Sequence, residues 1–479
     1  MKLTEIRAEL DAKNISAAEL AQEYIKKIHD TDGKVNSYIT VCADEAAAAA
    51  EHAQSLINSG NSKPMTGIPV SIKDNICTKG IKTTCASHML DDFVPVYNAT
   101  VIEKLNSEGA VILGKTNMDE FAMGGSSQTS YFGGVKNPYD TSRVSGGSSG
   151  GAAASVAAGL CAAALGSDTG GSVRQPSAFC GVTGLKPTYG AVSRWGLIAF
   201  ASSLDQIGII ANSAADTGYV LNCIYGQDKN DATSSARAQG NYTAKVGSDI
   251  KGLRIGLPKE FFGEGISDEV KTAVMNAAEY YKKLGCELVE CSLPSLEYAV
   301  SAYYLISSAE AASNLSRFDG IKYGFRSGLG EDYNSLISSS RREGFGDEVK
   351  RRIMLGNYAL CSGYYDAYYK NATRIRTQLR SEYAGIFEKC DVILTPTAPT
   401  AAYKIGEQEN DPVKMYLADI CTVTVNIAGL PGISTTCGYD KNNMPIGMSL
   451  VGRAFDEQTI IAVCDRFEQD FERKEARMR

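Results

Sequence analysis

Short apolar runs alternate with amphipathic stretches along most of the chain. Leu3, Ile6 and Leu10 recur at helical spacing, and the run Ala46–Ala50 continues the helical character of the first 60 residues. From Gly67 onward, apolar runs that predict buried strands alternate with segments that predict helices. The predicted strands are Ile68–Ile72, Ala110–Leu113, Leu160–Leu165, Leu253–Leu257, Glu287–Cys291, Val392–Leu394, Ile433–Cys437 and Ile446–Val451. The predicted helices are Thr100–Ser107, Asp268–Leu284, Tyr364–Phe387 and Glu457–Phe471.

This alternation favours an α/β fold, in which a sheet is covered by helices. We expect one α/β domain over residues 61–479, with residues 1–60 as an N-terminal helical extension packed on the core. The Gly- and Ser-rich stretch between Arg326 and Gly346 predicts a loop-rich region.

Composition narrows the function. The 479 residues carry 48 Lys and Arg against 55 Asp and Glu, a net charge of −7, which argues against binding nucleic acid through this chain alone. Three histidines make a His-rich metal centre unexpected, and we expect no metal or cofactor in this chain. Thirteen scattered cysteines without a C-x-x-C pair indicate reduced, mostly buried thiols.

The expected location follows from the same sequence. The first twenty residues are not a signal peptide, because charges interrupt their apolar positions. The uncharged stretch Val144–Ser167 is mostly Gly, Ser and Ala, which gain too little from lipid to insert. We therefore expect a cytoplasmic protein without a membrane contact.

A glycine-rich turn gives the densest chemical signal. Gly146–Gly151 has the sequence Gly-Gly-Ser-Ser-Gly-Gly and continues into an alanine-rich helix. Such a turn can bind phosphate through its N–H groups, but no Gly-Lys-Ser/Thr follows, so it is not a P-loop. The alternative is a small-residue turn that only lets the helix pack closely.

A second cluster, Gly166–Pro176, follows the predicted strand Leu160–Leu165. Ser172 stands after Gly170 and Gly171, where N–H groups converging on one point suit an oxyanion hole. The alternative is an ordinary Ser or Thr cap at a helix start.

Lys73 is a candidate general base, a role for which the chain has few histidines. It ends the apolar run Ile68–Ile72, and in a dry pocket a lysine loses its proton more easily. A neutral amine can deprotonate a serine through a second hydroxyl, for which Ser148 is suited by the glycines around it. The alternative is a surface lysine at the end of a strand.

Together these residues resemble the amidase signature family. Lys73, Ser148 and Ser172 match the family's Lys–cis-Ser–Ser triad. Ser148 lies in the motif Gly-Gly-Ser-Ser-Gly-Gly, and Ser172 ends the motif Gly-Ser-Asp-Thr-Gly-Gly-Ser. The resemblance implies a central mixed sheet covered by helices on both faces, with Ser172 as nucleophile, Ser148 as bridge after a cis peptide and Lys73 as base. The N–H groups expected to hold the oxyanion are those of Thr169, Gly170, Gly171 and Ser172.

Further motifs resemble the glutamine-hydrolysing subunits of tRNA-dependent amidotransferases. They cover nearly the whole chain and lie at Asn117–Met123, Gly184–Gly190, Ala201–Gly208 and Tyr416–Gly432. The resemblance implies that glutamine is the ammonia donor. It also implies a heterotrimer with two partners, the B and C subunits. The first would use ATP and Mg²⁺ to activate Glu-tRNA(Gln), or Asp-tRNA(Asn), and would bind most of the misacylated tRNA, while the small second one would brace the pair.

The glutamine-binding residues are also carried by resemblance, onto Arg352, Asp419 and Tyr303. Desolvated glutamine needs a cation for its α-carboxylate and an anion for its α-ammonium. Taken singly, Arg351 and Arg352 also fit a solvated charge pair, and Tyr303 and Tyr304 also fit a packed helix face.

Two other functions stay open. A free-standing amidase would use the same triad on small amides, and a catalytically silent scaffold would only bind partners. Arg352 and Asp419 weigh against the first, and the intact triad weighs against the second.

Overall fold

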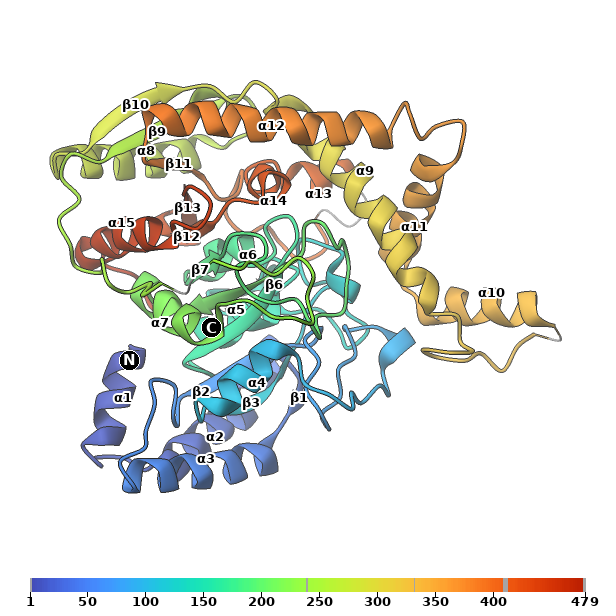
Figure 1. The fold of residues 1–479 in the computed structure, drawn as a ribbon, viewed down its shortest axis with the longest axis horizontal. Coiled ribbons are helices and arrows are strands. Elements are labelled where there is room, and N and C mark those ends of the chain that lie inside the picture. Colours follow the sequence, from blue (N-terminus) through green and yellow to red (C-terminus); the bar gives the residue numbers. More distant parts are fainter. Residues whose placement is uncertain (1, 238–239, 331, 408–411, 477–479) are drawn as a thin grey trace.

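A mixed β-sheet runs through the molecule (Figure 1). The structure, a computed structural model, describes residues 2–237, 240–330, 332–407 and 412–476. Within these ranges the sheet has eleven strands in the order β1-β3-β2-β6-β8-β7-β12-β13-β11-β9-β10, and β4 and β5 form a separate pair. The strands are β1 (Tyr38–Val41), β2 (Pro69–Lys73), β3 (Val111–Thr116), β4 (Lys136–Asn137), β5 (Asp140–Val144), β6 (Ala163–Asp168), β7 (Thr183–Lys186), β8 (Gln206–Ala211), β9 (Arg254–Pro258), β10 (Glu287–Cys291), β11 (Val392–Pro396), β12 (Gly432–Tyr439) and β13 (Pro445–Val451).

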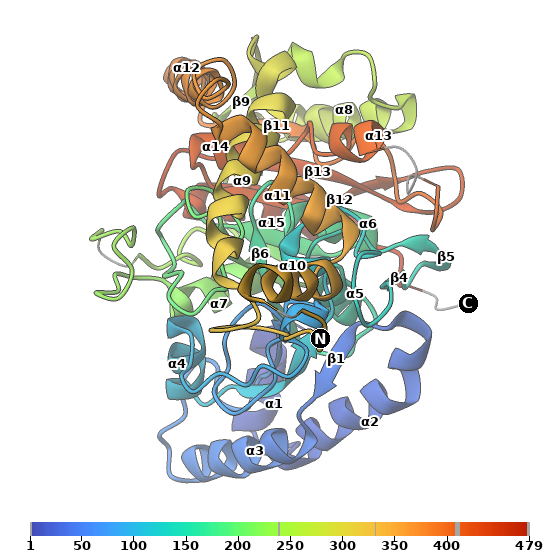
Figure 2. The ribbon, with the colours of Figure 1, turned by 90° about the vertical axis from the view of Figure 1, so that its right-hand side faces the viewer.

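Helices cover both faces of this sheet (Figures 1 and 2). The α-helices are α1 (Leu3–Asp11), α2 (Ala17–Val35), α3 (Ala43–Asn58), α4 (Thr100–Ser107), α5 (Gly150–Ala157), α6 (Arg174–Cys180), α7 (Ala214–Ile224), α8 (Asp268–Lys283), α9 (Leu296–Asn314), α10 (Tyr333–Gly344), α11 (Asp347–Leu360), α12 (Tyr369–Lys389), α13 (Pro412–Leu417), α14 (Val423–Ala428) and α15 (Glu457–Asp470). Short 3₁₀ turns are η1 (His88–Leu90), η2 (Glu120–Ala122), η3 (Lys259–Phe262) and η4 (Leu315–Arg317). Among the described residues, no helix is both long enough and apolar enough to cross a membrane.

The strand directions change along the sheet. β2 is parallel to β3 and to β6, and β9 is parallel to β10 and to β11. Antiparallel pairs join β6, β8, β7, β12, β13 and β11 between these groups. The expected α/β fold with a central mixed sheet is therefore confirmed.

The N-terminal segment is not purely helical. α2 begins at the cap Ser16, whose hydroxyl accepts from the Glu19 N–H, as expected of a helix start. Between α2 and α3 the chain forms β1, which joins the sheet antiparallel to β3. Four residues give too short an alternation for sequence to identify this strand. The division at residue 60 stays a prediction.

Two other expectations change. The Gly/Ser-rich region between Arg326 and Gly346 contains the helix α10, so the prediction of a loop-rich segment is wrong for its second half. Asp332 caps this helix by accepting from the Ser335 N–H at 2.8 Å. The predicted strand Leu160–Leu165 is observed three residues later, as β6, because small buried residues continue the pairing with β2 and β8.

A helical arm extends from the main body. It is formed by α9, η4, α10 and α11, and α10 projects farthest, on the right of Figure 1. α11 packs tightly on α9, because a Cβ built on Gly356 would lie 1.9 Å from the carbonyl oxygen of Ser308. α12 then returns the chain to the body and contacts α9 and α14.

Candidate active site

Two parallel strands bring the first candidate residues together. Ile72 of β2 is in register with Leu165 of β6, and both strands end at the same edge of the sheet. Lys73 is the last residue of β2, and the loop that carries Ser172 follows the end of β6. This is the edge at which parallel strands usually present functional side chains.

Lys73 is buried and contacts two serine hydroxyls. Its Nζ lies 2.7 Å from Ser148 Oγ, 2.8 Å from Ser149 Oγ and 3.3 Å from the Ser167 carbonyl oxygen. The side chain is 0% exposed, which excludes a surface lysine. Burial lowers the pKa of Lys73 from 10.5 to about 7, although nearby carboxylates, that of Asp119 foremost, oppose this shift.

The turn at Ser148 has the shape that the resemblance implied. The peptide bond between Gly147 and Ser148 is cis. A Cβ on Gly147 would lie 2.0 Å from Asp119 Oδ2, so this position requires glycine. The Ser149 N–H donates to the Ser172 carbonyl oxygen at 3.0 Å, which joins the turn to the Ser172 loop.

The glycine-rich turn also allows close packing. α5 begins after Ser149, and all of its residues up to Val156 are buried. A Cβ on Gly151 would lie 2.4 Å from the Asn117 carbonyl oxygen and 2.5 Å from that of Ser37. Close packing and the placement of Ser148 are therefore two roles of one turn.

The Ser172 loop folds around the carboxylate of Asp168. This carboxylate accepts from the N–H groups of Gly171 at 2.8 Å and Val173 at 3.1 Å, and Arg174 Nε donates to it at 3.0 Å. Burial opposes ionisation of Asp168, but the Arg174 guanidinium outweighs it and holds the Asp168 pKa well below its usual range. The Ser172 side chain is not a helix cap, because the cap residue of α6 is Val173.

The three triad residues differ in exposure. Ser172 is 7% exposed, whereas Lys73 and Ser148 are fully buried. Ser172 is therefore the most accessible of the three, and the Lys73 amine is kept from water. This order matches the roles expected from sequence, which stay predictions.

The predicted oxyanion donors are held from both sides. Thr169 Oγ1 donates to Asp205 Oδ1 at 2.7 Å, and Thr422 Oγ1 donates to the Gly170 carbonyl oxygen at 2.6 Å. Burial raises the pKa of Asp205 to about 6. The Gly171 N–H is already engaged by Asp168, unlike the expectation that it faces the oxyanion.

A second group of side chains surrounds Arg352 on α11. Arg352 is 2% exposed, and its Nε donates to Glu348 Oε1 at 2.8 Å. Its guanidinium lies 4.8 Å from the ring centroid of Tyr304 and 5.5 Å from that of Tyr416. Arg351 is different, because its side chain is 47% exposed. The interpretation of both as a solvated pair is therefore wrong for Arg352.

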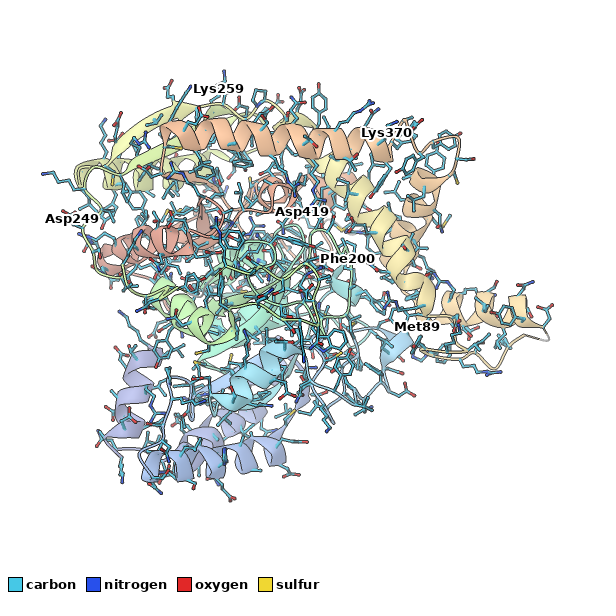
Figure 3. All side chains as sticks on the ribbon, in the orientation of Figure 1. Met89, Phe200, Asp249, Lys259, Lys370 and Asp419 are labelled. Atoms are coloured by element: carbon cyan, nitrogen blue, oxygen red, sulfur yellow. The ribbon has the colours of Figure 1, made fainter. Side chains whose placement is uncertain are left out.

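Asp419 and Tyr303 connect this group to the Ser172 loop. Tyr304 Oη donates to Asp419 Oδ2 at 2.6 Å, and burial raises the pKa of Asp419 to about 7. The Tyr303 ring lies against Gly170, since a Cβ there would be 2.5 Å from Tyr303 Cζ. Thr422 links the two, because its hydroxyl lies within hydrogen-bond distance of the carbonyl oxygens of both Gly170 and Asp419. Figure 3 shows Asp419 in the middle of the molecule.

Several residues of the site were not expected from sequence. Ser149 is the second hydroxyl on Lys73, and Tyr304 rather than Tyr303 binds the Asp419 carboxylate. Asp168 and Asp205 hold the loop backbone and the Thr169 hydroxyl. Their only sequence signal is a place inside the motifs already noted. Among the described residues no group of three or more His, Cys, Asp and Glu side chains is placed to bind a metal.

Comparison with known proteins gives a consistent result. The profile of the amidase family matches residues 19–461. The chain is 54% identical to the A subunit of glutamyl-tRNA(Gln) amidotransferase from Thermoanaerobacter pseudethanolicus, over 98% of this chain and 96% of that protein. It is also 54% identical to the protein of the same name in Ruminiclostridium cellulolyticum, over 99% and 98%.

Solved structures agree. The crystal structure of the A subunit of glutamyl-tRNA(Gln) amidotransferase from Thermotoga maritima has a TM-score of 0.80 at 39% identity, covering 95% of this chain and 92% of that one. The peptide amidase of Stenotrophomonas maltophilia has a TM-score of 0.84 at 27% identity, covering 99% and 98%.

Proposed function

The chain belongs to the amidase family, and from this premise we propose that it is the glutamine-hydrolysing subunit of a tRNA-dependent amidotransferase. It hydrolyses glutamine to glutamate and ammonia. Relatives with more than half of their residues identical, over nearly their whole length, carry the name of the A subunit of such an enzyme, which supports the assignment.

One observation carries the chemistry. Lys73 Nζ is fully buried, lies 2.7 Å from Ser148 Oγ and has its pKa lowered to about 7 by burial. A large fraction of the amine is therefore neutral near pH 7 and can accept a proton. General bases work best when their pKa lies near the working pH.

The proposed reaction uses the three residues in series. Ser172 Oγ attacks the side-chain amide carbon of glutamine, its proton passes to Ser148 Oγ, and the Ser148 proton passes to neutral Lys73. The N–H groups of Thr169, Gly170 and Ser172 stabilise the oxyanion, while that of Gly171 is held by Asp168. The proton on Lys73 then returns through Ser148 to the leaving nitrogen, which departs as ammonia. A water molecule attacks the resulting Ser172 ester by the same relay and releases glutamate.

Glutamine is held by groups on the arm side of the site. Arg352 binds the α-carboxylate and Asp419 the α-ammonium, while the Tyr303 ring packs beside the reacting amide. Two observations support this assignment. Arg352 is 2% exposed, and the one carboxylate of Glu348 pairs with both Arg351 and Arg352. The buried guanidinium can therefore pair with a second anion. The elevated pKa of Asp419, about 7, falls when an ammonium group binds beside it.

The proposed partners follow from the assignment. The B subunit uses ATP and Mg²⁺ to activate Glu-tRNA(Gln), or Asp-tRNA(Asn), and consumes the ammonia; the heterotrimer is completed by the C subunit. The tRNA binds mainly through the first of these partners, in keeping with the net charge of −7 on this chain. The cytoplasm is the proposed location, supported by thirteen free cysteines.

The test separates ammonia release from ammonia use. In the assembled enzyme, Ser172→Ala removes glutamine hydrolysis and glutamine-dependent amidation, while amidation supported by added ammonium continues. Loss of both amidation reactions with the assembly intact would contradict this division of labour.

The alternative is a free-standing amidase, favoured by the structural likeness to a peptide amidase. Turnover of simple amides and peptide amides by the isolated chain, compared with glutamine turnover in the assembled enzyme, discriminates the two. Rapid turnover of simple amides that does not respond to the B and C subunits would support the alternative.

A further inference from the structure

A buried carboxylate contacts the N-terminal end of α11. Glu120 lies in η2 and is 3% exposed. Its Oε2 accepts from the N–H of Gly346, the cap residue of α11, at 2.9 Å, and its Oε1 accepts from the same N–H at 3.2 Å. Burial raises the pKa of Glu120 to about 7, although the Ser87 hydroxyl and the Gly346 N–H favour its charged form, which also interacts favourably with the helix dipole.

Other residues near Glu120 also join the arm to the body of the molecule. The Ser87 hydroxyl donates to Glu120 Oε1 at 2.5 Å and also lies 3.2 Å from the Gly344 carbonyl oxygen, at the end of α10. The Phe121 ring packs against Phe345, with centroids 5.6 Å apart. The carbonyl oxygen of Met89, a residue labelled at the base of the arm in Figure 3, accepts from the Phe325 N–H at 2.8 Å.

The residue that contacts the arm is next in sequence to one that contacts the Ser148 turn. The Asp119 N–H donates to the Ser148 carbonyl oxygen at 3.3 Å, and the Asp119 carboxylate lies against Gly147. The next residue, Glu120, holds α11. Two consecutive residues therefore connect the Ser148 turn to the helix that carries Arg352.

The Glu120–Gly346 contact is relevant to Arg352 because both lie on or at the start of α11. α11 is fixed to α9 at Gly356 and to Glu120 at Gly346. Arg352 lies between these two points, six residues after Gly346, which corresponds to roughly 9 Å along the helix. The Glu120 contact is therefore the hydrogen bond that joins the start of α11 to η2, about two helical turns before Arg352, whereas Gly356 joins the other end of the helix to α9.

We propose that Glu120 is a positioning residue that sets the distance between Arg352 and the Lys73–Ser148–Ser172 triad. It acts through the Gly346 N–H and does not touch the substrate. This inference rests on the proposed function, because it takes Arg352 as the group that binds the α-carboxylate of glutamine.

The test measures binding and triad reactivity separately. Glu120→Gln removes the charge and keeps the size, and Glu120→Ala removes the contact. In the full-length chain assayed with its partner subunits, we expect the KM for glutamine to rise about tenfold in Glu120→Ala, as expected for loss of a buried hydrogen bond. We expect a smaller rise in Glu120→Gln, because its amide oxygen can still accept from the Gly346 N–H. We expect kcat and the rate of Ser172 sulfonylation by phenylmethylsulfonyl fluoride to stay unchanged.

Glu343 on α10 offers a matched control. Glu343→Gln removes a carboxylate that accepts from Ser327 Oγ at 2.8 Å and should leave the KM unchanged. An unchanged KM in both Glu120 variants overturns the proposal. A parallel fall in kcat and in the sulfonylation rate also overturns it, because it indicates general damage to the fold.

A parallel variant separates this proposal from the function itself. Arg352→Gln should raise the KM for glutamine at least as much as Glu120→Ala. If Arg352→Gln raises the KM and the Glu120 variants do not, only the positioning role fails. If Arg352→Gln leaves the KM unchanged, the assignment of Arg352 to the substrate fails.

Discussion

Replacing Lys73 by methionine should abolish glutamine hydrolysis and, at neutral pH, stabilise the protein. Burial lowers the pKa of this amine from 10.5 to about 7. Between these two values the unfolded chain holds a proton that the native chain has released, so the free energy of unfolding rises with pH in this window. At pH 7 the buried lysine therefore destabilises the native state by about 4 kcal/mol relative to a residue that does not titrate.

Lost hydrogen bonds offset part of this gain. Lys73 Nζ contacts Ser148 Oγ and Ser149 Oγ at 2.7 and 2.8 Å, and each contact contributes about 1 kcal/mol. Methionine has a similar length and leaves no large cavity. We expect Lys73→Met to be more stable than the parent by about 2 kcal/mol at pH 7 and about equally stable at pH 9.

Urea unfolding of both proteins at pH 7 and pH 9 measures this difference. Comparison at the same pH cancels the titration of the buried tyrosines and cysteines. A variant that is less stable at pH 7, or a difference that does not change with pH, would refute the description of Lys73 as an amine whose pKa is lowered by burial.

Three further predictions concern the pH profile, the packing and the substrate site. With a simple amide such as butyramide, which lacks the ammonium group that pairs with Asp419, kcat/KM should rise with pH and level off above about pH 7, because neutral Lys73 is required; a rate that falls across this range would contradict it. Gly151→Ala should destabilise the chain by about 1–3 kcal/mol in thermal unfolding, because the new Cβ meets the Asn117 carbonyl oxygen at 2.4 Å, whereas Gly385→Ala on α12, with no atom within 4 Å, should not destabilise it. Arg352→Lys should raise the KM for glutamine about tenfold or more, since lysine cannot reproduce the forked guanidinium stacked on Tyr304. Arg351→Lys should leave the KM unchanged, because the Arg351 side chain is 47% exposed, and equal effects would argue against a special role for Arg352.

Most strands with strong apolar runs were predicted, although β8, which holds three isoleucines, was not, and strands without such runs were missed. β9, β10 and β13 appear close to where alternation places them. β7 has Leu185 as its only large apolar residue, and it forms because β8 and β12 pair with its two edges. Such a strand depends on tertiary pairing that no local pattern records.

The site shows the same limit. The spacing of Lys73, Ser148 and Ser172 was available from the motifs. The apolar run before Lys73 left a surface lysine open as an alternative, which the burial of Lys73 excludes. Sequence did not distinguish Tyr303 from Tyr304, because the two are adjacent on α9 and differ only in which side of the helix faces Asp419 or Gly170. That direction depends on how α9 packs.

The carboxylate of Asp168 was missed for a related reason. In the sequence it is one polar residue of a turn, whereas in the structure its oxygens accept from the N–H groups of Gly171 and Val173. A turn that closes on its own side chain is recognised only once the backbone is folded.

Detection of the acyl group would test Ser172 as the nucleophile without relying on rates alone. The full-length chain, with its partner subunits, is mixed with glutamine, quenched in acid during turnover and analysed by peptide mass spectrometry. We predict a glutamyl ester on Ser172 that is absent from Ser172→Ala. A glutamyl group on Ser148 or on a cysteine, or turnover that persists in Ser172→Ala, would contradict the proposed mechanism.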